Sequence, residues 1–131
     1  MILAHLTENE KIWFSNLIVF LVEDDNLVEN IEQDFLVRYR MELGLGELDN
    51  TLGFEKALAN FVEHSDDIVK KSVFLELACI TFCDPYYLPV EKKNLQRVAD
   101  VLEIKNAADF IAVAKELTPV LTKAFCLFGE W

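Results

Sequence analysis

The stretch VFLELACITFCDPYYLPVEKKNLQRVADVLEI, residues 73–104, decides the fold. Its first part is apolar nearly all round, and this apolar run ends at an acid, Asp84. Two prolines follow, and the chain restarts at Glu91 with apolar residues that recur at the spacing of a helix. Two helices joined by so short a turn form a helix hairpin. The stretch therefore predicts such a hairpin, with one acid on each side of its turn.

The same pattern occurs earlier in the chain, in residues 14–45, and matches residues 73–104 without a gap at an offset of 59 residues. Each half is an apolar helix, an Asp, a short turn, a Glu and an amphipathic helix. A self-similar pattern of this kind indicates an internal repeat, and we expect the two hairpins to pack about a pseudo-twofold axis. The identical pairs are Asp25 and Asp84, Glu32 and Glu91, Leu36 and Leu95, Arg38 and Arg97, and Leu43 and Leu102.

The rest of the chain also has helical periodicity, and the sequence predicts an all-α, compact bundle of about seven helices in one domain, residues 1–131. Thr7 and Glu10 are spaced as a capping box. The fourth helix, from an N-cap at Ser65 to about Cys83, is apolar nearly all round and should be central. The other expected helices run from about Glu29 to Leu43, from Phe54 to His64 and from Val90 to Glu103, and the last two begin at Asn106 and at Thr118-Pro119.

The chain is strongly acidic, because 12 Lys and Arg stand against 23 Asp and Glu, which gives a net charge of −11. Such a surface repels nucleic-acid phosphates and anionic lipids. We therefore expect no nucleic-acid partner, and cations or basic proteins are the partners that the charge favours. The hydrophobic fraction of 53% indicates a folded core rather than disorder.

Three cysteines, Cys79, Cys83 and Cys126, fit a reducing compartment better than a disulfide scaffold. The N-terminal residues lack the features of a signal peptide, and the longest nearly uncharged runs are too short to span a bilayer. We therefore expect a cytoplasmic protein with no direct membrane insertion. Its oligomeric state is left open.

The repeated acids are the candidate site. Asp25 and Asp84 follow apolar helices, while Glu32 and Glu91 fall in the first turn of the next helix. A turn between them brings the two carboxylates of each half together, and like charges that close favour a cation or a proton between them. Oxygen ligands suit Ca²⁺, Mg²⁺ or Mn²⁺ rather than Zn²⁺. The alternatives are ordinary helix-dipole and turn roles for these acids, or contacts with a partner's Lys or Arg.

Other residues carry weaker signals. Cys79 and Cys83 lie on one face of the expected central helix and are interpreted as small core residues, because no further Cys or His is near in the sequence. His64 is interpreted as a surface residue at a helix end. No phosphate-binding loop or hydrolase motif occurs.

The repeated pattern of apolar helix, Asp, turn, Glu and amphipathic helix resembles the tellurite-resistance TerB-like family. In that family each half carries an Asp and, seven residues later, a Glu, which correspond here to Asp25 with Glu32 and Asp84 with Glu91. The glycine that follows each Asp in the family is replaced by Asn26 and Pro85. The resemblance implies a compact all-α domain, associated with stress response and not an enzyme, whose paired acids form a metal-binding surface.

Two hypotheses for function follow. The first is a non-catalytic TerB-like domain that binds a divalent cation weakly through Asp25, Glu32, Asp84 and Glu91. The second is an acidic protein-interaction module that covers a basic surface and uses no metal. Catalysis by the paired carboxylates is disfavoured, because the sequence places no nucleophile or electrostatic catalyst beside them.

Overall fold

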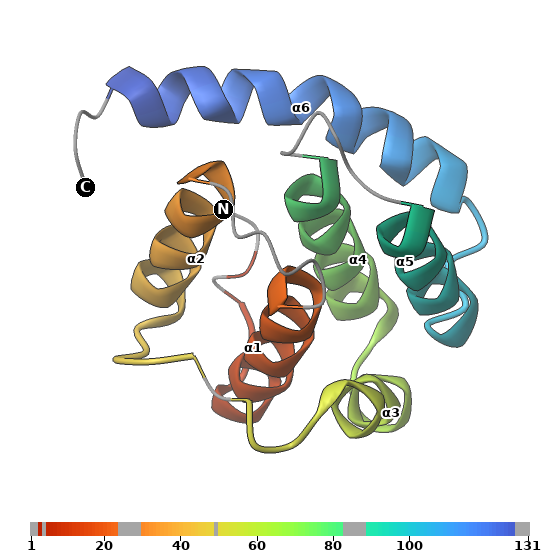
Figure 1. Ribbon diagram of the computed structural model, residues 1–131. Coiled ribbons are helices and arrows are strands. Elements are labelled where there is room, and N and C mark those ends of the chain that lie inside the picture. Colours follow the sequence, from red (N-terminus) through yellow and green to blue (C-terminus); the bar gives the residue numbers. More distant parts are fainter. Residues whose placement is uncertain (1–2, 4, 24–29, 49, 83–88, 128–131) are drawn as a thin grey trace.

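The computed structural model describes residues 3, 5–23, 30–48, 50–82 and 89–127, and the side chains in these ranges except at 22–23, 30–35, 89–92 and 125–126. The described part of the chain is all-α, with six helices and no strand (Figure 1). The helices are α1 (Glu8–Glu23), α2 (Asn30–Leu43), α3 (Phe54–His64), α4 (Asp67–Phe82), α5 (Pro89–Val101) and α6 (Ala107–Leu127). None of them is long and apolar enough to cross a membrane.

Helix α4 forms the centre of the bundle, as its all-round apolar sequence predicts. It packs against α1, α5 and α6, whereas α3 packs against α1 and α5 (Figure 1). Its buried residues lie around most of the helix, since Val73, Phe74, Glu76 and Cys79, which fall at widely separated angles, are each at most 1% exposed. A soluble helix can be apolar all round only when other elements cover each of its faces.

The prediction of seven helices is wrong, because the expected break at Thr118-Pro119 does not occur and α6 continues through Pro119. Proline removes one backbone hydrogen bond from a helix interior. Threonine hydroxyls add bonds around this position: Thr118 Oγ1 donates to the Ala114 carbonyl at 2.7 Å, and Thr122 Oγ1 donates to the Thr118 carbonyl at 3.0 Å. Thr118 is also buried against α4, so tertiary packing holds this turn in the helix.

The capping box predicted at the start of α1 is confirmed. The Glu10 amide donates to Thr7 Oγ1 at 3.2 Å, and the Thr7 amide donates to Glu10 Oε1 at 3.0 Å. The predicted N-cap of α4 is wrong by one residue, because Asp66 Oδ1 accepts the Val69 amide at 2.9 Å. Ser65 instead ends α3, and its hydroxyl donates to Glu10 Oε2 at 2.5 Å. The capping glutamate of α1 therefore also holds the turn between α3 and α4.

A buried asparagine joins α1 to the loop before α3. Asn16 Oδ1 accepts the amides of Leu52 and Gly53 at 3.0 and 3.1 Å, and its Nδ2 donates to the Ile12 carbonyl at 2.9 Å. Gly53, with a φ of 89°, precedes the first residue of α3. The side chain of Asn16 thus satisfies two loop amides that the fold places beside the core.

The ends of α2 and α5 have the same local structure. Leu45 donates its amide to the Arg40 carbonyl at 3.0 Å, and Ile104 donates its amide to the Ala99 carbonyl at 2.9 Å. The residue before each donor has a left-handed backbone: Gly44 has a φ of 69° and Glu103 has a φ of 57°. Both ends are Schellman-type caps, but only the first has the glycine that such a position favours.

Candidate functional site

The four predicted site residues lie at the boundary of what the structure describes. Asp25 and Asp84 lie outside the described residues. Glu32 is the third residue of α2 and Glu91 is the third residue of α5, while their side chains lie outside the described set. The first-turn location predicted for both glutamates is confirmed at the level of the backbone.

The helices that flank these acids run in matched directions. In Figure 1, α1 and α4 run the same way, α2 and α5 run the opposite way, and α1 contacts α4. The C-terminal ends of α1 and α4 and the N-terminal ends of α2 and α5 therefore lie at one end of the bundle. The helix bounds also match at the offset of the sequence pattern, since α1 spans Glu8–Glu23 and α4 spans Asp67–Phe82.

A buried polar contact in the described core joins α2 to α4 and was not predicted from the sequence. Glu76 is only 1% exposed, and its Oε2 accepts the hydroxyl of Tyr39 at 2.8 Å. The same hydroxyl lies 3.3 Å from the Glu76 carbonyl oxygen. Burial, together with the neighbouring Glu76 carboxylate, raises the pKa of Tyr39 well above its ordinary value. Tyr39 therefore serves as a neutral hydrogen-bond donor to a buried acid.

The sequence does carry a signal for this contact. Glu76 is the one charged residue in the apolar run from Ser72 to Cys83, and a buried acid needs a partner. Its position corresponds to Leu17 at the offset of 59, so an apolar position in the first half is occupied by an acid in the second. The identity of the partner, 37 residues away in the chain, could not be read from the pattern.

Cys79 is a core residue, as interpreted from the sequence. Burial and, to a smaller extent, Glu76 raise the pKa of its thiol to about 12. The thiol is therefore protonated at neutral pH, which makes it a poor nucleophile. Cys83 lies outside the described residues, and so does the side chain of Cys126.

Open depressions occur on the described surface, and two of them contain charged or titratable side chains. One, of about 320 Å³, lies between α4 and the loop before α6, and its charged lining is Asp67, Lys70, Lys71, Glu103 and Lys105. The other, of about 350 Å³, is lined by Thr7, Asn9, Glu10, Trp13 and His64. His64 is exposed at the end of α3, as interpreted from the sequence. Its ring centroid lies 5.9 Å from that of Trp13.

Neither depression combines an activated nucleophile with a general base. The carboxylate of Glu10 is already hydrogen-bonded to the Thr7 amide and the Ser65 hydroxyl. Among the residues that the structure describes, no three His, Cys, Asp or Glu side chains are grouped so that they could hold a metal ion.

Comparison with known proteins found no matching family model, no matching curated protein and no matching solved structure.

Proposed function

We propose that the chain is a non-catalytic TerB-like helical domain, built from two copies of one hairpin, that binds a divalent cation weakly through Asp25, Glu32, Asp84 and Glu91. The observation that carries the proposal is the match between helix bounds and sequence pattern. The helices α1 and α4 begin and end 59 residues apart, and α2 and α5 begin 59 residues apart. The shared direction of the two hairpins supports a common location for both acid pairs (Figure 1).

The chemistry of the proposed site follows from the helix ends. A carboxylate in the first turn of a helix is stabilised by the helix dipole, whereas one at the C-terminal end is destabilised. Each hairpin thus contributes one acid that is favoured as an anion and one that gains more from a neighbouring cation. Four carboxylates supply hard oxygen ligands, which suit Ca²⁺, Mg²⁺ or Mn²⁺. Each hairpin alone supplies too few oxygens for tight Ca²⁺ binding, so we expect weak affinity.

Calorimetry and thermal unfolding with Ca²⁺, Mg²⁺, Mn²⁺ and Zn²⁺ test the proposal. A cation that binds only the folded state raises Tm in a saturable way. The double substitution Asp84→Asn with Glu91→Gln should abolish the shift. The control substitutions Glu47→Gln with Glu63→Gln remove the same charge from two exposed positions outside the repeated acids and should leave it intact. If the metal-induced rise in Tm is lost equally in both variants, the effect depends on overall charge, and the proposed site is refuted.

The second candidate function is an acidic interaction module that covers a basic protein surface. The net charge of −11 and the open character of both depressions on the described surface favour it. If none of the four metal ions shifts Tm, the cation site is excluded and this function remains. It then predicts that a Lys- and Arg-rich peptide binds the metal-free protein, with an affinity that falls as salt is added.

A further inference from the structure

Helix α6 carries an exposed apolar seam, made of Val113, Leu117, Val120, Ala124 and Leu127. Val113, Val120 and Leu127 are 49%, 60% and 86% exposed, and Leu117 and Ala124 are partly buried. The spacing alternates between three and four residues, which is the spacing of a coiled-coil seam. Exposed apolar side chains at such regular spacing mark contact surfaces, so we expect the seam to contact another apolar surface.

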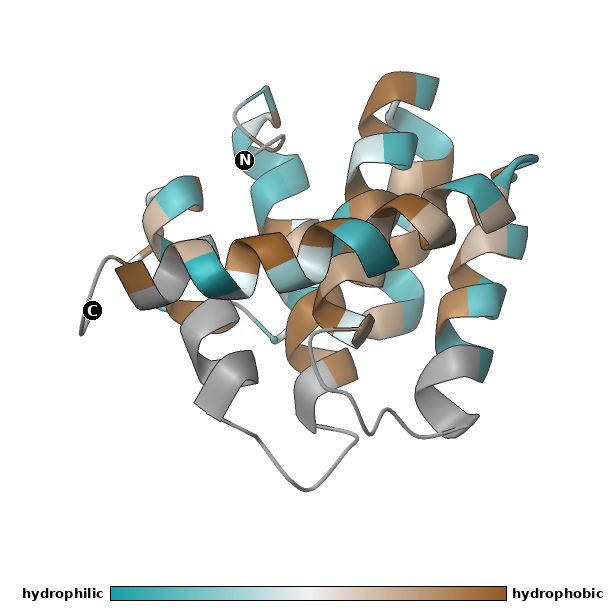
Figure 2. Ribbon diagram, turned by 90° about the horizontal axis from the view of Figure 1, so that it is seen from above, coloured by the Kyte–Doolittle hydropathy of each residue, from teal (hydrophilic) through white to brown (hydrophobic). Residues whose placement is uncertain are grey.

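The seam lies beside the face that α6 uses within its own chain, and Leu117, which packs partly against the core, belongs to both. Ala114 and Thr118 are buried, and Thr118 Oγ1 lies 3.4 Å from the Cys79 carbonyl of α4. In Figure 2, α6 lies across the near side of the bundle, and hydrophobic residues recur along its ribbon. Helix α6 thus has one apolar stripe toward α4 and, beside it, a second whose Val113, Val120 and Leu127 are exposed to solvent.

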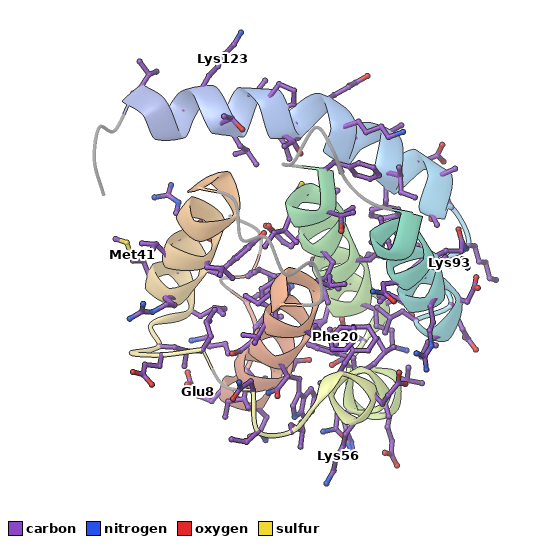
Figure 3. The ribbon with its side chains drawn as sticks, in the orientation of Figure 1. Glu8, Phe20, Met41, Lys56, Lys93 and Lys123 are labelled. Carbon is purple, nitrogen blue, oxygen red and sulfur yellow. The ribbon has the colours of Figure 1, made fainter. Side chains whose placement is uncertain are left out.

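The charged residues beside the seam indicate which surface can pair with it. Asp109, Glu116 and Lys123 are exposed and seven residues apart, so they follow one edge of the seam. In Figure 3, Lys123 projects from α6 away from the bundle. If two α6 helices pair antiparallel with Glu116 near the twofold axis, Asp109 of each copy faces Lys123 of the other. A parallel pair would place like charges at the same level.

We propose that two copies of this chain associate through the seam of α6, paired antiparallel, with Asp109 of each copy against Lys123 of the other. The contact is isologous, so each attractive pair forms twice. In this register, Val120 of one copy lies close to Val113 of the second copy, and the two Leu117 side chains lie near the axis. Glu116 of one copy lies near Glu116 of the other copy at the axis, and the repulsion between these two carboxylates weakens the dimer. The proposal uses no residue of the acid pairs and is independent of the proposed function.

Sedimentation equilibrium across a dilution series tests the dimer. Val120→Asp should raise the dimer Kd by roughly a hundredfold, because it buries an unpaired charge in the seam. Asp109→Lys and Lys123→Asp should each raise the Kd by about tenfold, because each change turns two attractive pairs into two repulsive ones. The double variant, with both changes, should restore the parental Kd, and Glu116→Gln should lower it.

A matched control is Lys56→Asp, which makes the same charge change as Lys123→Asp on an exposed residue of α3, and should leave the Kd unchanged (Figure 3). Circular dichroism checks that each variant is folded. Because Val120 is mostly exposed, its replacement should preserve the monomer fold. The proposal is overturned if the parent is monomeric at every concentration. It is equally overturned if Val120→Asp leaves the dimer intact or if the double charge reversal fails to restore the parental Kd.

Discussion

Replacing Glu103 by glycine should stabilise the protein. Glu103 has a φ of 57° at the end of α5, and its amide donates to the Asp100 carbonyl at 3.2 Å. A left-handed backbone costs a residue other than glycine about 1–2 kcal/mol. Glycine removes that cost but adds about 0.5–1 kcal/mol of entropy to the unfolded chain. The free energy of unfolding should therefore rise by about 0.5–1 kcal/mol, since the backbone bonds of the cap are retained.

The equivalent position at the end of α2 supplies the inverse experiment. Gly44 has a φ of 69°, and an added Cβ would meet no atom within 4 Å. Gly44→Ala should therefore destabilise through backbone conformation alone, by about 1 kcal/mol. The two substitutions change the same kind of cap in opposite directions.

Urea denaturation followed by circular dichroism measures both changes. The midpoints should move in opposite directions while the slope m stays constant. Each change corresponds to roughly 2–5 °C in Tm for a chain of this size. Glu103→Gln is the control for charge, because removing an anion from a helix C-terminus is itself favourable. If Glu103→Gly gains no more than Glu103→Gln, backbone strain at this cap is not the cause and the reasoning fails.

Three further outcomes are expected. Tyr39→Phe should lower the free energy of unfolding by about 1.5–3 kcal/mol in urea denaturation, because the buried Glu76 loses a hydrogen-bond donor; an unchanged midpoint would contradict this. Burial raises the pKa of Cys79 in the folded protein from 9.0 to about 12. The contribution of this thiol to the free energy of unfolding should therefore be complete below pH 9 and should fall by about 1.4 kcal/mol per pH unit between pH 9 and about 12, as the unfolded thiol ionises. Cys79→Ala should make the fall of Tm with rising pH above pH 9 less steep. An equally steep fall in the variant would show that the thiol is not its cause. Asn16→Ala should cost about 2–4 kcal/mol in the same denaturation assay, because two loop amides lose their acceptor; Asn16→Asp, which keeps an acceptor, should cost less.

Local signals in the sequence predicted the parts of the fold that depend on neighbouring residues. The capping box of Thr7 and Glu10 needs only a spacing of three residues, and both of its hydrogen bonds are present. The central position of α4 follows from its lack of a polar face. Asp66, rather than Ser65, caps α4 because Ser65 donates its hydroxyl to Glu10, 55 residues away. Such a competing partner cannot be read from local spacing.

Long-range packing decided what the sequence pattern missed. Pro119 indicates a helix start when read alone, but Thr118 is buried against α4 and α6 continues through this position. The pairing of Tyr39 with Glu76 joins two helices whose contact the periodicity does not specify. For the candidate site, the pattern placed Glu32 and Glu91 in first turns, which the helix bounds confirm. Whether their carboxylates meet those of Asp25 and Asp84 depends on how the hairpins pack, which no local pattern encodes.

The double use of Glu10 affects how the N-terminus responds to thermal fluctuation. Its carboxylate accepts both the Thr7 amide and the hydroxyl of Ser65, so the first turn of α1 is tied to a junction far along the chain. Helix ends usually fray, and their amides exchange with solvent rapidly. Here the Ser65 hydroxyl holds the Glu10 carboxylate in place, so the acceptor of the Thr7 amide is fixed by a residue of the α3–α4 junction. The hydrogen exchange of the Thr7 amide should therefore be slower in the parent protein than in a Ser65→Ala variant.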